Sequence, residues 1–375
     1  METDISKVYF ADFHTKPKEN LLQKLRRLII SAGIDQIDFQ NKFTAIKMHF
    51  GEPGNLAYLR PNYARVVAEQ VRERGGRPFL TDCNTLYAGR RKNALEHLDA
   101  AYENGFSLQA AGCHIIIGDG IKGTDDIAVP VRGTYVQEAK IGRAVMDADI
   151  LISLTHFKGH EVAGFGGALK NIGMGCGSKA GKMEMHSSGK PRVGRRKCTG
   201  CGFCTAHCAY QAITVKDGTA VLDQERCTGC GRCIGMCPFD AIFAAEDEAF
   251  SVINKKIAEY CLAVLQNKPA FHISLVTDVS PNCDCRWEND VPIVPDVGMF
   301  ASFDPVALDL ACAEAVNRQP VIEGSLLNRK MRLKKGEANC RDHFINTHPD
   351  TDWHVLIEHA AGIGLGNTSY ELIKI

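Results

Sequence analysis

The sequence predicts an α/β protein whose mostly parallel sheet, flanked by helices, is interrupted by a small cysteine-rich α+β insert. Strand-like and amphipathic helical stretches alternate over the first 190 residues, and similar periodicity returns after about residue 246. Strands that alternate with helices of this length indicate right-handed crossovers between parallel strands. We therefore expect residues 1–190 and 246–375 to form one α/β domain, with residues 191–245 as the insert.

Before the insert, short apolar runs rich in β-branched and aromatic residues predict five strands. They are Lys7–Phe13, Phe43–Phe50, Arg77–Cys83, His114–Gly118 and Asp149–Thr155. Apolar residues at helical spacing predict helices between them, beginning near Leu21, Asn62 and Lys92. The last two end at Gly75-Gly76 and Asn104-Gly105, which are common helix stops. The polar and basic stretch from Ser187 to Lys197 then predicts a linker.

After the insert, Ile253 and Ile257 begin another helical pattern. Strands are expected at Phe271–Val276 and Val291–Val294, with a final edge strand at Tyr370–Ile375. Between them, Asp304 followed by Pro305 is typical of a capped helix start, because proline fits the first turn.

The insert contains a direct repeat of the spacing C-x2-C-x2-C-x3-C. This is the spacing of bacterial ferredoxins with two [4Fe–4S] clusters, in which the fourth cysteine of each block binds the other cluster. The sequence thus predicts a ferredoxin-like insert with one cluster on Cys198, Cys201, Cys204 and Cys237, and a second on Cys227, Cys230, Cys233 and Cys208. Zinc sites fit poorly, since they usually use two C-x2-C pairs a dozen or more residues apart.

A glycine-rich segment with histidines and lysines follows the strand that ends near Thr155. In open α/β sheets, ligands bind beyond the carboxyl ends of the strands. Glycines let backbone amides approach a ligand, and lysines favour an anion. We expect catalytic roles for His156, Lys158, His160, Lys170 and His186, and binding of a cofactor or acceptor by Gly166, Gly167, Asn171 and Cys176. Neither a P-loop nor a dinucleotide-binding fingerprint occurs here.

An additional metal is a separate hypothesis, either at His156 and His160 or at Cys283 and Cys285. The histidines have i,i+4 spacing, although Gly159 argues against a regular helix between them. Cys283 and Cys285 could equally act as a redox pair or be ordinary core thiols.

Several ordered segments together resemble the "domain of unknown function 362" family, many of whose members carry an inserted or appended two-cluster ferredoxin module. The segments are Lys47-Met-His49-Phe-Gly51-Glu52, Gly118-Asp119-Gly120, Thr155-His156-Phe-Lys158-Gly-His160, Gly166-Gly-Ala-Leu-Lys170-Asn171 and Ser302-Phe-Asp304-Pro305-Val-Ala-Leu-Asp309. The resemblance implies an α/β domain assembled from both sides of the insert, together with [4Fe–4S] clusters. It implies no particular reaction.

Composition and hydrophobic patterning indicate which classes of partner and which compartment to expect. Lysine plus arginine (44) equals aspartate plus glutamate (44), so charge gives no reason to expect nucleic acid or an anionic membrane surface. No apolar run approaches the roughly 18 residues of a spanning helix. The first residues lack the pattern of a secretory signal, so we expect a cytoplasmic protein.

These observations lead to one principal hypothesis, an iron–sulfur oxidoreductase. Low-potential electrons would enter from a redox partner protein or another external donor, and would reach a small-molecule acceptor at the glycine-rich loop. The alternatives are an electron-transfer subunit or docking module for a separate enzyme, or a metal- or cofactor-assembly protein.

Overall fold

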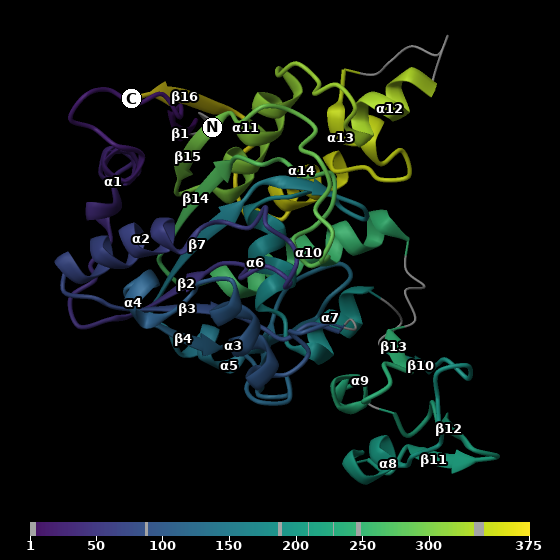
Figure 1. The fold of residues 1–375 in the computed structure, drawn as a ribbon. Helices are drawn as coiled ribbons and strands as arrows, with labels where there is room; N and C mark the ends of the chain where they lie inside the picture. The colour runs from purple at the N-terminus through teal and green to yellow at the C-terminus, as the bar shows by residue number, and fades with distance from the viewer. Residues whose placement is uncertain are drawn as a thin grey trace.

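The structure, a computed structural model, describes residues 5–86, 89–186, 190–208, 210–227, 229–244, 249–333 and 341–375. Its main feature is an eight-stranded sheet in the order β16-β1-β15-β14-β7-β2-β3-β4, with helices on both faces (Figure 1). The predicted fold class, an α/β protein with a mostly parallel sheet, is confirmed.

Five adjacent strands of the sheet run parallel. They are β14 (Ala270–Val276), β7 (Ile150–His156), β2 (Phe43–Lys47), β3 (Arg77–Asp82) and β4 (His114–Ile117). The pairing of β7 with β14 aligns Ile152 with Phe271 and joins chain from before and after the insert. Both flanks of the insert therefore build one sheet, and the carboxyl ends of these strands meet at one edge.

The other strands complete the sheet with mixed directions. Strand β15 (Gly298–Ser302) is antiparallel to β14 and to β1 (Ser6–Ala11), and β16 (Tyr370–Lys374) lies at the edge as predicted. The prediction of a strand at Val291–Val294 is wrong, because the structure has bends there. Pro292 and Pro295 lack the N–H that a strand between two neighbours must donate.

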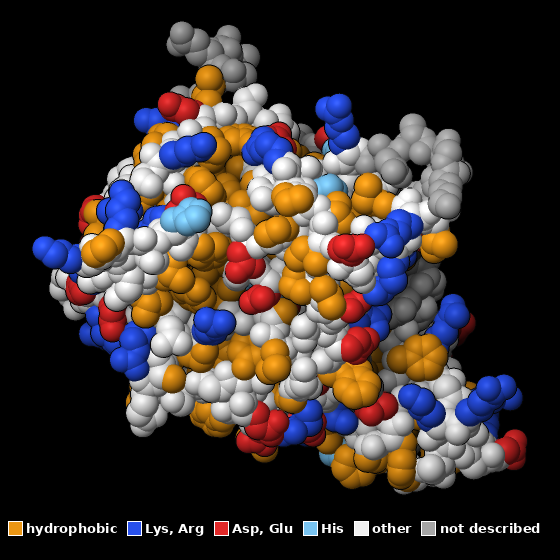
Figure 2. All heavy atoms as spheres, turned by 45° about the horizontal axis from the view of Figure 1, so that its top comes forward, with side chains coloured by type: hydrophobic (Ala, Val, Ile, Leu, Met, Phe, Trp, Pro, Cys, Tyr) orange, Lys and Arg blue, Asp and Glu red, His pale blue; other side chains and the backbone are white. Residues whose placement is uncertain are grey.

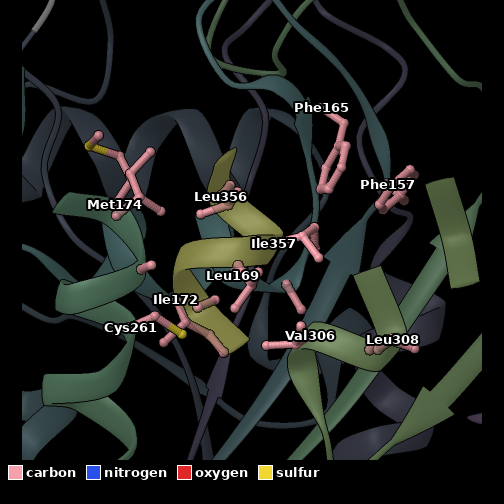
Figure 3. Close-up of a cluster of buried hydrophobic side chains, with 14 of the residues drawn as sticks. Phe157, Phe165, Leu169, Ile172, Met174, Cys261, Val306, Leu308, Leu356 and Ile357 are labelled. Carbon is pink, nitrogen blue, oxygen red and sulfur yellow. The ribbon is translucent and has the colours of Figure 1, made fainter. Parts of the chain in front are cut away.

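Helices form two layers, one on each face. The first layer contains α1 (Leu21–Ser31), α2 (Pro61–Glu73) and α3 (Ala94–Glu103); the second contains α6 (Ala168–Cys176), α10 (Phe250–Leu265), α11 (Pro305–Asn317) and α14 (His354–Gly362). On β7, Ile152 and Leu154 pack with the first layer and Leu151 with the second, since side chains alternate along a strand. Figure 3 shows the second layer, where Leu169 of α6 lies near Val306 and Ile357.

The predicted start of α11 is confirmed in detail. Asp304 is the N-cap residue, and its side chain accepts hydrogen bonds from the backbone N–H groups of Val306 and Ala307. Pro305 occupies the first turn, where a missing N–H costs nothing.

The insert forms a small α+β unit beside α7 (Lys179–His186), away from the large sheet (Figure 1). It consists of β10 (Pro191–Val193), α8 (Phe203–His207), β11 (Ile213–Lys216), β12 (Thr219–Leu222), α9 (Arg232–Met236) and β13 (Ile242–Ala244). Residues 187–189 of the expected linker lie outside the described residues. The linker prediction is wrong for Pro191–Val193, which pairs with β13.

Smaller elements connect these parts. They are a 3-10 turn (Ile34–Gln36), α4 (Leu108–Ala111), the hairpins β5 (Asp126–Pro130) with β6 (Glu138–Gly142) and β8 (Lys158–His160) with β9 (Gly164–Gly166), α5 (Arg143–Asp147), α12 (Leu326–Leu333) and α13 (His343–Thr347). Among the described residues, no helix combines the length and the apolar character that crossing a membrane requires.

Basic and acidic side chains both occur across the face shown in Figure 2, in keeping with the balanced composition.

Candidate functional site

Polar and charged side chains gather where β2, β3, β7 and β14 end. Most of them are buried, and we call this group the strand-end site. Its members are Lys47, Asp82, His156, Lys158, His160, Lys170, Asn171, Cys283, Asp284 and Cys285. Seven of the candidate residues named from the sequence, including Cys283 and Cys285, thus come together with Asp284 and with the last residues of two further strands.

His156 and Lys158 hold the loop after β14 through Asp284. The Nδ1 atom of His156 lies 2.9 Å from an Asp284 carboxylate oxygen, and Nε2 lies 2.8 Å from the carbonyl oxygen of Thr277. Lys158 Nζ lies 3.1 Å from the same carboxylate. Burial alone would raise the pKa of Asp284, but the neighbouring charges of His156 and Lys158 lower it. The buried Asp284 carboxylate therefore fixes the loop through its contacts with His156 and Lys158.

These contacts bear on the hypothesis of a metal at His156 and His160. Both ring nitrogens of His156 already face hydrogen-bond acceptors, an Asp284 carboxylate oxygen and the Thr277 carbonyl oxygen, whereas a metal ion needs a free nitrogen lone pair. The Nδ1 atom of His160 accepts from the backbone N–H groups of Val162 (3.1 Å) and Ala163 (3.0 Å). A metal would have to displace such partners, and the extra-metal hypothesis stays a prediction.

Cys283 is surrounded by hydrogen-bond donors. Lys170 Nζ lies 3.3 Å from its sulfur and the backbone N–H of Cys285 lies 3.4 Å away. The side chains of Cys285 and His160 also influence the thiol electrostatically. The hydrogen bond from Cys285, with Lys170 and His160, outweighs burial and lowers the pKa of the Cys283 thiol, while that of Cys285 is raised. These shifts favour the thiolate form of Cys283 and the thiol form of Cys285.

His186, the last residue of α7, completes the surroundings of this thiolate. Burial first, and then the charges of Lys170 and His160, lower the pKa of His186 to about 3. The imidazole is therefore neutral at pH 7. The catalytic role expected for His186 stays a prediction, and it would start from the neutral ring.

Within the strand-end site, a second buried group joins β2, β3 and α6. Lys47 Nζ lies 3.0 Å from Asp82 Oδ1 and 2.8 Å from Asn171 Oδ1. Asp82 also faces Arg91 at 3.8 Å, and Arg91 donates to Glu52 at 2.8 Å. These charged residues are not among the site residues predicted from the sequence. Lys47 and Asp82 are the last residues of parallel strands, which is the signal that could have identified them.

The predicted binding glycines have a packing role in the structure. A Cβ at Gly167 would overlap the carboxylate of Asp309, which accepts hydrogen bonds from the backbone N–H groups of Ala168 (2.6 Å) and Leu169 (2.9 Å). At Gly166 a Cβ would lie 3.2 Å from Lys158 Cε. These glycines therefore make room for the cap of α6 and for a lysine of the site.

Cys176, at the end of α6, lies apart from the thiolate. It is fully buried, and its carbonyl oxygen accepts from the Cys83 thiol at 3.4 Å. Burial raises the pKa of Cys176 to about 11, with the charges of Lys47 and Asp82 nearby. Its environment favours a neutral thiol at the second buried group.

In the insert, the eight cysteines of the repeat line two hollows. One, which we call the distal hollow, is lined by Cys198, Cys201, Cys204 and Cys237. The other, the proximal hollow, is lined by Cys208, Cys227, Cys230 and Cys233, and its Gly231 packs against Lys179 of the large domain. The fourth cysteine of each block thus lies with the first three of the other.

Backbone geometry around the hollows repeats with the sequence. Gly200 and Gly202 have φ of 66° and 73°, and Gly229 and Gly231 have φ of 71° and 67°. Backbone N–H groups at equivalent positions donate to sulfur, from Ala212 to Cys208 (3.3 Å) and from Ala241 to Cys237 (3.2 Å). Across the described ranges, no three His, Cys, Asp or Glu side chains are arranged around a single metal ion.

Helix α7 connects the insert to the strand-end site. At its first residue, the Lys179 side chain packs against Gly231 of the proximal hollow and donates to the carbonyl oxygen of Lys92. Met183 belongs to the same apolar cluster as Leu86 and Cys233. The helix ends at His186, whose pKa is affected by the charges of Lys170 and His160.

Comparison with known proteins gives a family and a distant fold likeness. Residues 44–314 match the family described as a domain of unknown function, DUF362. Two similar solved structures are the lactate racemase apoprotein from Thermoanaerobacterium thermosaccharolyticum (12% identity, TM-score 0.35) and a protein from Thermotoga maritima (13% identity, TM-score 0.44). The alignments cover 73% and 82% of this chain, but only 51% and 60% of those chains. No curated protein matches.

Proposed function

We propose that this chain, which belongs to the DUF362 family, is an iron–sulfur oxidoreductase. The insert would hold two [4Fe–4S] clusters, and low-potential electrons would pass from it to the strand-end site. The clusters supply one-electron transfer when bound, and the residues of the chain position them and receive the electrons.

The observation that carries this proposal is the grouping of eight cysteines around two hollows, four to each, with the fourth ligand exchanged between blocks. Four thiolates per hollow are the donor set of a [4Fe–4S] cluster. Because these cysteines would bind four different iron atoms, they need not converge on one point as the ligands of a single ion do. The N–H groups that donate to Cys208 and Cys237 suit sulfurs carrying negative charge.

The position of the hollows suggests a direction for the electrons. Cys201, at the distal hollow, is exposed, so an external donor can approach it. The proximal hollow includes Gly231, which packs against Lys179 of the large domain. Electrons would therefore enter at the distal hollow and leave from the proximal one toward α7.

The strand-end site has the properties expected of a site that holds the electron acceptor. It is buried and contains the cations Lys158 and Lys170, with His160 as a hydrogen-bond donor. Such groups stabilise the negative charge that reduction adds to an acceptor.

Electron paramagnetic resonance of the protein, purified without oxygen and reduced with dithionite, tests the proposal. We expect signals of two reduced [4Fe–4S] clusters that are broadened by their mutual magnetic interaction, since the hollows are adjacent. The absence of a cluster signal after reduction would contradict the proposal. Signals that appear but never decay with any small acceptor would favour the alternative of a docking module.

A further inference from the structure

We propose that Cys283 and Cys285 form a dithiol–disulfide pair that takes up the electrons delivered by the insert. The pair would be the first acceptor at the strand-end site, and its substrate would be a small molecule containing a disulfide bond. This inference rests on the proposed function for its electron source, although formation of the disulfide can be tested separately.

The two sulfurs are close and differ in character. The backbone N–H of Cys285 donates to the Cys283 sulfur at 3.4 Å, so the loop already folds the second cysteine back onto the first. Cys283 is 1% exposed, whereas Cys285 as a residue is partly exposed. Lys170 and His160 point donors at Cys283, as expected of a site that stabilises the thiolate of a redox-active pair.

The loop that carries the pair is fixed on both sides. Asp284, between the cysteines, is held by His156 and Lys158, and its carbonyl oxygen accepts from the backbone N–H of Glu52 at 3.0 Å. Glu161 accepts from the Cys283 backbone N–H at 3.4 Å and from Arg286 at 2.6 Å. A loop anchored this firmly keeps the sulfurs together in both oxidation states.

The path from the insert is short. Helix α7 has 8 residues, so its ends are about 10 Å apart at 1.5 Å per residue. Lys179 at one end packs against the proximal hollow, and His186 at the other lies within the electrostatic reach of Cys283. One helix therefore leads from the proximal hollow to a residue that senses the charge of Cys283.

The electron count also matches. Two clusters carry one electron each, and reduction of the Cys283–Cys285 bond consumes two electrons and one proton, giving the Cys283 thiolate and the Cys285 thiol. In the second half of the cycle, one sulfur of the pair attacks the substrate disulfide and releases the first substrate thiolate. The other sulfur then attacks the mixed disulfide, which closes the Cys283–Cys285 bond and releases the second substrate thiol.

The test begins with the probe 2,2′-dithiodipyridine, added to the anaerobic holoprotein. After removal of the probe and alkylation with N-ethylmaleimide, peptide mass spectrometry should show the segment with Cys283 and Cys285 unlabelled and lighter by two hydrogen atoms. The Cys285→Ser variant should retain no such internal bond. The matched control Cys113→Ala, in the core beneath α1, α2 and α3, should behave as wild type.

The oxidised proteins are then given two electrons per chain from dithionite and sampled by freeze-quench electron paramagnetic resonance. In wild type and Cys113→Ala, the signal of the reduced clusters should rise and then decay as two maleimide labels appear on the peptide. In Cys285→Ser the signal should persist. Failure of wild type to form the bond, or a cluster signal that lasts as long in oxidised wild type as in Cys285→Ser, would overturn the inference.

The outcomes separate the two proposals. If no cluster signal ever appears, the proposed function fails and the electron source with it, while the peptide mass still reports whether the disulfide forms. If the cluster signal appears but does not decay as the Cys283–Cys285 bond is reduced, the proposed function stands and the inference fails.

Discussion

Asp284 occupies the position between the two cysteines, and its carboxylate meets His156 and Lys158. All three side chains are buried, so removal of one leaves a charge without its partner in a medium that solvates it poorly. The residue is thus a structural anchor for the loop that holds the thiolate.

Replacement of Asp284 by alanine should lower the stability by about 3–5 kcal/mol, because Lys158 loses its carboxylate partner. Glu323→Ala, which removes the exposed partner of Arg332, should cost less than about 1 kcal/mol. Thermal unfolding midpoints of the anaerobic proteins measure both. Equal midpoints for the two variants would show that the buried pair contributes no more than an exposed one.

The same carboxylate predicts acid sensitivity. The pKa of Asp284 is lower in the folded protein than in the unfolded chain. Its contribution to stability is therefore present above the unfolded pKa, about 3.9, and is lost as the pH falls through the folded pKa.

Asp309 predicts the opposite pH dependence. Burial raises the pKa of Asp309 to about 7, although the N–H groups of Leu169 and Ala168 act against this. Because the pKa of Asp309 is raised in the folded protein, its contribution to the free energy of unfolding is fully present below the unfolded pKa. This contribution is lost as the pH rises through the folded pKa of about 7. The loss amounts to about 1.4 kcal/mol for each pH unit that separates the folded from the unfolded pKa.

Asp309→Asn, which cannot ionise, should therefore lose less stability than wild type between about pH 5 and about pH 8. Unfolding midpoints of both proteins at the two pH values measure the difference. A parallel pH dependence in the two proteins would contradict the assignment of this titration to Asp309.

Among the elements, α6 depends on glycine for its place against α10. A Cβ at Gly173 would overlap the backbone oxygen of Ile257, so the two helices could not approach as closely. Because α6 carries Lys170 and Asn171, its position also sets the strand-end site.

Gly173→Ala should therefore destabilise the protein by about 1–3 kcal/mol through overpacking, and should shift Lys170 relative to Cys283. Gly362→Ala is the matched control, since Gly362 ends α14 with nothing within 4 Å of the added Cβ. It should be neutral or stabilise by about 0.5–1 kcal/mol. Unfolding midpoints compare the two, and equal effects would refute the role of close helix packing.

How far an element could be predicted depended on what its residues contact. Strands β2, β3, β4, β7 and β14 and the start of α11 follow from local apolar runs and caps, and the sequence predicts them closely. The strand prediction at Val291–Val294 failed because Ile293 and Val294, although apolar and buried, lie in a loop. Strand β15, the true neighbour of β14, has no signal that separates it from such a loop.

The site could be predicted only in part for a similar reason. His156, Lys158 and His160 follow a strand directly, so local reasoning finds them. Cys283 was recognised as a candidate, but its donors Lys170 and His160 lie more than a hundred residues away in the chain. Only the parallel pairing of β7 with β14 brings these segments together.

On the scale of the whole molecule, the insert and the sheet meet along α7 and the neighbouring Lys92. Lys92 Nζ lies 3.3 Å from Asp240 of the insert, and Leu86 packs in the same apolar cluster as Ile234. This contact fixes the proximal hollow beside the domain that carries the strand-end site. The insert is therefore held at a fixed position relative to the strand-end site, as the proposed delivery of electrons to one acceptor requires.

The content of the two hollows is the central claim, and metal analysis of the protein purified without oxygen tests it most directly. Iron, acid-labile sulfide and all other transition metals should be quantified per chain. Two [4Fe–4S] clusters predict about 8 iron and about 8 sulfide. Zinc in place of iron, with little or no sulfide, would contradict the account.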